Sequence, residues 1–189
     1  VIMGAERRSM VMPEEERLNT AYHESGHTVV AKILADNTDP VHKVTIIPRG
    51  RALGVTMQLP EEDRYSHNRE HLLARIAVLM GGRIAEEVFM KQMTTGAAND
   101  FEQATNLAQK MVQRWGMSDE LGPRVFGDND SEVFLGRDVS THRNISNAIA
   151  EQVDQEVSRI IQEQYDRARQ IIESRKETIE TMTSALIDW

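Results

Sequence analysis

Two short stretches of the chain each carry a pair of histidines four residues apart with a glutamate between them. The first is HESGH, with His23, Glu24 and His27, and the second is HNREH, spanning residues 67–71. On a helix, residues four apart lie about 40° apart around the axis, so both imidazoles can reach one metal ion. In HESGH, Glu24 lies on the same side and can act as a base toward water at that metal. The pattern therefore indicates metal-assisted hydrolysis.

The surroundings distinguish the two pairs. HESGH lies in a segment with apolar residues on more than one face, so we expect its helix to be largely buried. Gly26 costs about 1 kcal/mol relative to alanine inside a helix, which suggests that another element approaches its backbone closely. HNREH lies at the polar start of its helix, where we expect solvent-exposed side chains and no metal. The alternative for HESGH is a pair of hydrogen-bonded histidines in the core.

A third ligand must come from elsewhere in the chain, and four acidic residues compete for that place. These are Glu86, Glu87, Asp100 and Glu102. Asp100 follows the small-residue stretch TTGAAND, which allows close approach to another element. The alternative role for Asp100 is an N-cap, where aspartate is favoured. Spacing alone places Asp100 only modestly ahead of Glu86.

The elements that would position these residues are mostly helices. We expect helices over about 13–35, 66–90, 100–115 and 139–187, the last with a break near Ser174. Runs of β-branched residues at 44–47 and 55–59 predict two short strands, and Pro48 and Gly54 make at least one of them an edge strand. The pair Gly81-Gly82 predicts a kink or close packing. The predicted fold class is mainly α, with a small β element.

Composition excludes several classes of protein. The formal net charge is −8, which argues against a general nucleic-acid binder. The chain has no cysteine, so disulfides and thiolate metal sites are ruled out. No apolar run approaches the ~20 residues needed to span a bilayer. The first residues, VIMGAERRSM, do not have the pattern of a signal peptide, and we expect the chain to be a soluble fragment of a longer protein.

Several longer motifs, in order, resemble the peptidase domain of the FtsH-type ATP-dependent zinc metalloproteases. They are TAYHESGHTVVA, VTIIPRGRALGVTMQLPEEDR, GGRIAEEVF, TTGAANDFEQATNLAQKMVQRWGMSDELGP and EVFLGRD. The resemblance implies a helical zinc-peptidase fold with a small β element near the active site. It implies one zinc ion held by His23, His27 and Asp100, Glu24 as the general base, and a supporting role for Glu86.

The resemblance also implies a domain organisation. Residues 1–12 would be the tail of a linker from a missing ATPase module, and residues 13–189 the metallopeptidase domain. Its catalytic core would cover about 13–116 and its C-terminal helical part about 139–189. The whole protein would be a homo-hexamer, anchored in a membrane by segments absent here, with the catalytic domain facing the cytoplasm or an organelle interior. ATP would bind only in the absent module, since the chain has no G-x-x-x-x-G-K-[ST] motif.

Two further departures from the family pattern stand out. Ser25 occupies a position where alanine is more usual, and the stretch from Val88 to Met93 is shorter than expected and lacks a Gly-Pro pair. The second departure leaves the path of the 88–99 loop undetermined by the sequence.

Substrates would be unfolded or membrane proteins. An edge strand with Gly54, Val55, Thr56 and Met57 would pair with the backbone of an extended chain. The alternative for that strand is a lid over the core. Two rival functions remain open: an interaction module built on 139–189 with a structural metal, and a metal hydrolase that acts on a non-peptide substrate.

Overall fold

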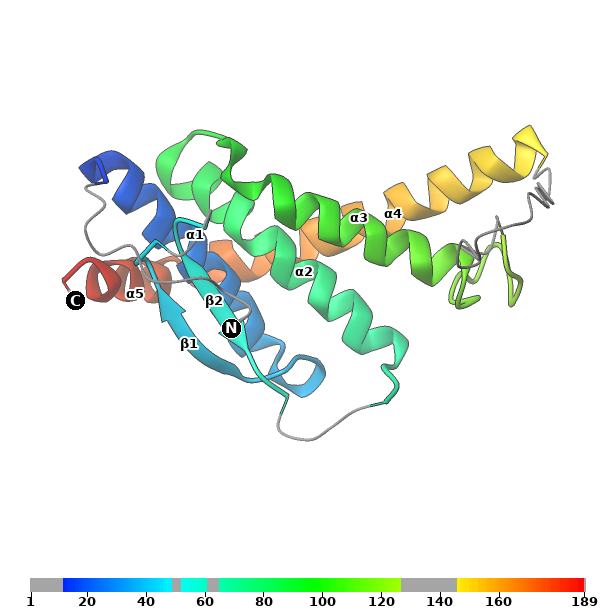
Figure 1. The fold of residues 1–189 in the computed structure, drawn as a ribbon, viewed down its shortest axis with the longest axis horizontal. Helices are drawn as coiled ribbons and strands as arrows, with labels where there is room; N and C mark the ends of the chain where they lie inside the picture. Colours follow the sequence, from blue (N-terminus) through cyan, green and yellow to red (C-terminus); the bar gives the residue numbers. More distant parts are fainter. Residues whose placement is uncertain (1–11, 49–51, 61–64, 127–145, 189) are drawn as a thin grey trace, which may run out of the picture.

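The computed structural model describes residues 12–48, 52–60, 65–126 and 146–188, and in this part of the chain the fold is mainly helical (Figure 1). Its α-helices are α1 (Glu14–Ile33), α2 (Arg69–Ala85), α3 (Ala98–Gln113), α4 (Asn147–Ser174) and α5 (Lys176–Asp188). Shorter helical turns are η1 (Ala35–Asn37), η2 (Glu86–Met90) and η3 (Thr95–Ala97), and the strands are β1 (Val41–Thr45) and β2 (Val55–Gln58). The predicted fold class is confirmed.

Helices α1 and α2 cross at a pair of glycines. A Cβ atom added to Gly26 would lie 2.3 Å from the carbonyl oxygen of Gly81, and one added to Gly81 would lie 2.8 Å from the carbonyl oxygen of Gly26. The two backbones therefore touch, which confirms the close approach predicted at Gly26. Helix α2 continues through Gly81 and Gly82, so these glycines serve close packing.

The long helix α4 packs against α2 and α3, crossing behind them in Figure 1. Its buried apolar residues recur at helical spacing: Val153, Val157, Ile160, Ala168 and Ile172. Helix α5 then returns to pack against α1. There the Thr183 hydroxyl donates a hydrogen bond of 3.0 Å to the Ser25 hydroxyl, and both side chains are buried. The unusual Ser25 thus has a specific partner.

The two strands form an antiparallel sheet that lies against α1 (Figure 1). Their register pairs Val44 with Thr56 and Thr45 with Val55. Within the described residues, β2 pairs with β1 alone and leaves its other edge free. This confirms the predicted edge strand.

Several boundaries differ from the prediction. Helix α2 begins at Arg69, three residues late, because the side chain of Asn68 caps it by accepting the N–H of His71. Its α-helical pattern ends at Ala85, and a π-helical turn, η2, follows. The break after Ser174 is confirmed.

The C-terminal helical part is described from residue 146 onward, so residues 139–145 of its predicted span lie outside the described residues, as do residues 1–11 of the predicted linker. In the part of the chain that is described, no helix has the length and apolar character that crossing a membrane requires.

Candidate metal centre

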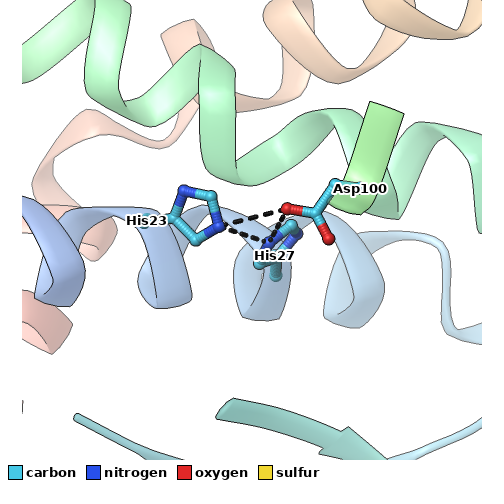
Figure 2. Close-up of side chains that lie close together, drawn as sticks. All are labelled: His23, His27 and Asp100. Atoms are coloured by element: carbon cyan, nitrogen blue, oxygen red, sulfur yellow. Dashed lines mark hydrogen bonds and ion pairs between the residues drawn. The ribbon is translucent and has the colours of Figure 1, made fainter. Parts of the chain in front are cut away.

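Two helices bring three potential metal ligands together (Figure 2). Helix α1 carries His23 and His27, whose Nε2 atoms lie 3.0 Å apart. Helix α3 carries Asp100, whose Oδ2 lies 3.2 Å from Nε2 of His23 and 3.4 Å from Nε2 of His27. Within the described residues, no other group of three histidine, aspartate or glutamate side chains has a geometry suited to a metal ion.

The separations of these three atoms fit zinc. Ligand atoms about 2.0–2.1 Å from a tetrahedral zinc ion lie about 3.3 Å from one another. The observed separations of 3.0, 3.2 and 3.4 Å are close to that value. Among the described residues, two imidazoles and one carboxylate fill three tetrahedral positions and leave the fourth without a protein ligand, which is typical of catalytic rather than structural zinc sites.

The other nitrogen of each imidazole is held by a fixed acceptor. Nδ1 of His27 lies 2.7 Å from the carbonyl oxygen of Val78 on α2. Nδ1 of His23 lies 2.8 Å from Oε1 of Glu86. A proton on each Nδ1 leaves each Nε2 lone pair directed at the cluster, which is the tautomer that metal binding requires.

Glu86, the strongest rival to Asp100, therefore lies behind His23 rather than in the cluster. It is 1% exposed, and it accepts hydrogen bonds from the backbone N–H and the hydroxyl of Thr94. These contacts tie the π-helical turn to the chain that leads into α3, and they define the path of the loop between the two. Lys91 reverses the chain there, with a φ of 55°.

The remaining acidic candidates point elsewhere. Glu87 accepts hydrogen bonds from Tyr165 and Arg169 on α4, and Glu102 is exposed to solvent. Asp100 lies in the first turn of α3, whereas the N-cap position belongs to Ala97. The alternative role of Asp100 as an N-cap is therefore wrong.

Charges in the cluster favour a bound cation. Burial lowers the pKa of His23, but hydrogen bonds with Asp100 and Glu86 outweigh it and raise that pKa to about 9. Burial raises the pKa of Asp100, yet the two histidines hold it well below its usual range. Without metal, a proton therefore takes the place of the cation between the carboxylates.

Glu24 lies between α1 and the sheet. Its Oε2 accepts a hydrogen bond of 2.6 Å from the Thr56 hydroxyl on β2. A Cβ atom on Gly54 would lie 2.6 Å from its Oε1. The four residues expected to bind substrate therefore lie on two faces of the strand. Gly54 and Thr56 face Glu24, whereas Val55 and Met57 face the opposite side.

Two site residues escaped the sequence analysis. A Cβ atom on Gly82 would lie 2.6 Å from Nε2 of both His23 and His27, so this glycine leaves the space for the cluster. The glycine pair indicated close packing but not that one member faces the histidines. The Val78 carbonyl left no sequence signal, because any residue supplies one.

The second histidine pair was interpreted only partly correctly. His67 is exposed as expected, but His71, in the first turn of α2, is buried. The two rings stack with centroids 4.5 Å apart.

Comparison with known proteins agrees with this geometry. Residues 10–189 match the model of peptidase family M41. The chain belongs to this family. All of this M41 chain aligns with the ATP-dependent zinc metalloprotease FtsH of Magnetococcus marinus at 54% identity and with FtsH 4 of Sorangium cellulosum, also at 54%. It is 47% identical to FtsH of Photobacterium profundum.

The M41 chain spans less than a third of the length of these relatives, since it covers 28%, 29% and 27% of them respectively. The family resemblance noted in the sequence is thereby confirmed for this segment.

Proposed function

We propose that this chain is a zinc-dependent endopeptidase unit in which His23, His27 and Asp100 hold one zinc ion and Glu24 is the general base. The observation that carries the proposal is the cluster of three ligand atoms at the spacing of a tetrahedral zinc site. Relatives that are 54% identical to this chain support the proposal, since they are zinc metalloproteases.

Zinc, when bound, supplies a Lewis acid that polarises the scissile carbonyl and activates water. The chain's own groups fix the metal ligands and transfer the proton. Val78 and Glu86 hold the imidazoles by their Nδ1 atoms, so the ligands do not rotate during the reaction. The Glu24 carboxylate takes the proton of the attacking water and then delivers it to the leaving nitrogen.

The substrate would be an extended polypeptide. In the part of the chain that the structure describes, nothing pairs with the outer edge of β2, whose backbone N–H and C=O groups could bind any sequence by strand addition. Backbone pairing of this kind requires an unfolded stretch of substrate, so we propose unfolded or membrane proteins as substrates.

The chain would work within a longer protein. We propose that residues 13–189 form its metallopeptidase domain and that an ATPase module and a membrane anchor lie in other segments. The supports are the words "ATP-dependent" in the relatives' names and their greater length. The homo-hexameric assembly and the cytoplasmic or organellar orientation rest on the family resemblance alone.

Digestion of unfolded casein tests this proposal. The purified protein should cleave casein, lose activity with a zinc chelator and regain it with zinc. Glu24→Gln should lower the cleavage rate by at least about 100-fold and keep its zinc, because the amide cannot accept the water proton. Glu102→Gln is the matched control, since it alters an exposed glutamate two residues from Asp100.

The rival functions predict different results in these experiments. An interaction module with a structural metal would bind zinc and leave casein intact. Near-normal cleavage by Glu24→Gln would contradict the role of Glu24.

A further inference from the structure

The mechanism proposed above needs the Glu24 carboxylate in one fixed place. A glutamate side chain has several rotatable bonds, and freezing it in one conformation costs side-chain entropy. Helix α1 positions the Cα atom of Glu24 but not its carboxylate. A group from another element must therefore hold that carboxylate near the metal ligands.

Thr56 supplies such a group. Its Oγ1 lies 2.6 Å from Oε2 of Glu24 and 3.2 Å from the Glu24 backbone carbonyl. A hydroxyl has a single proton to donate, and the shorter contact to a charged acceptor is the stronger one. No other hydrogen bond to this carboxylate occurs within residues 12–48, 52–60, 65–126 and 146–188.

Gly54 leaves the space that the Glu24 side chain occupies. A Cβ atom there would lie 2.6 Å from Oε1 and 2.7 Å from Cγ of Glu24, so the side chain fits only beside a glycine. Residues 54 and 56 are two apart in an extended segment and share one face. The same face thus leaves room for the Glu24 side chain and donates to its carboxylate.

The Thr56 side chain is directed toward α1 and not along the proposed substrate-binding edge of β2. The Thr56 hydroxyl also lies 3.5 Å from that of Thr28 on α1. The free edge of β2 offers backbone groups, which any residue at this position would provide.

We propose that Thr56 is a positioning residue that holds Oε2 of Glu24 and leaves Oε1 to accept the proton from water. The inference rests on the proposed peptidase function. It makes β2 serve two purposes, because the strand that would align the substrate backbone also aligns the base. The position of the scissile bond relative to the Glu24 carboxylate would then depend on β2 alone.

Steady-state hydrolysis of a fluorogenic peptide by the zinc-loaded protein tests the inference. Thr56→Val keeps the shape and strand preference but removes the hydroxyl, and kcat should fall about 10- to 100-fold with KM within about 2-fold. Thr56→Ser should restore most of the wild-type kcat. Thr45→Val makes the same chemical change on the neighbouring strand, where the hydroxyl contacts the N–H of Ile47, and should behave as wild type.

Three results in Thr56→Val would overturn the inference: kcat and KM both unchanged, a raised KM with an unchanged kcat, or loss of zinc. The second would make Thr56 a substrate contact, and the third would make it structural.

A measurement without substrate separates this inference from the proposed function. The carboxylate carbon of Glu24, assigned in NMR spectra with the Glu24→Gln variant, should shift in Thr56→Val and return in Thr56→Ser. An inactive wild-type protein whose Glu24 signal responds in this way would contradict the peptidase function alone. A signal unchanged in Thr56→Val would overturn the role of Thr56 whatever the activity.

Discussion

His23 lies between two carboxylates, one facing each of its ring nitrogens. Asp100 is 3.2 Å from its Nε2 and Glu86 is 2.8 Å from its Nδ1. Hydrogen bonds with both carboxylates raise the pKa of His23 to about 9, against the lowering effect of burial. A cation bound at Nε2 therefore takes the place of the proton that His23 otherwise holds there beside Asp100.

Metal binding should consequently release a proton. At pH 7, below the raised pKa, metal-free His23 is protonated, and zinc needs its Nε2 lone pair. Zinc affinity should therefore rise as the pH rises toward about 9 and level off above that pKa. Calorimetry in buffers of different ionisation enthalpy should show about one proton released per zinc at pH 7.

Glu86→Gln removes one of the groups that raise the His23 pKa, so this variant should release fewer protons per zinc at pH 7 than the wild-type protein. Glu102→Gln, on the exposed face of α3, should leave the release unchanged. Zinc binding without proton release at pH 7 would contradict this electrostatic account.

The sequence identified individual residues unevenly. His23, Glu24 and His27 could be predicted together, because helical spacing alone puts them on one side of α1. Asp100 and Glu86 could not be clearly separated by spacing, because both lie close to His23, one at each ring nitrogen. Spacing placed Asp100 only modestly ahead of Glu86, and the family resemblance decided between them.

At the scale of elements, the glycines of the α1–α2 crossing have two distinct roles. Gly26 and Gly81 let the helix backbones touch, whereas Gly82 leaves room for the two imidazoles. Substitution by alanine should separate these roles.

Gly26→Ala places a methyl group against the Gly81 carbonyl and should lower the free energy of unfolding by about 3 kcal/mol. In Gly82→Ala the new methyl group meets ring atoms of His23 and His27, which can shift in the metal-free protein only by straining their Nδ1 hydrogen bonds. The helix preference of alanine, about 1 kcal/mol, partly offsets that cost. The variant should change stability by less than about 1 kcal/mol and abolish zinc binding.

Urea unfolding of the metal-free variants, with zinc analysis of the loaded ones, measures both effects. Full zinc content in Gly82→Ala, or stability equal to wild type in Gly26→Ala, would contradict the assignment.

The elements themselves could largely be predicted from periodicity, and the contacts between them could not. The apolar spacing gave α4 and its break, and the β-branched runs gave the hairpin. The contact of Thr56 with Glu24 was missed because alternation predicts that a strand has two faces, but not which face meets a given helix.

At the scale of the whole molecule, the site depends on how α2 joins its neighbours. Asp100 lies 73 residues after His27, and α2 packs against both α1 and α3. The π-helical turn after α2 and the Thr94 contacts with Glu86 then direct the chain so that α3 starts beside α1. This geometry follows from the crossing of helices and has no local sequence signal.

The central claim is that His23, His27 and Asp100 together hold the zinc ion, and zinc content per chain tests it most directly. The wild-type protein and Glu24→Gln should contain one zinc ion per chain. Asp100→Ala should lose most of its zinc, whereas Glu86→Ala should keep it at saturating metal with an affinity about 10- to 100-fold weaker. Full zinc content at wild-type affinity in Asp100→Ala would contradict the claim.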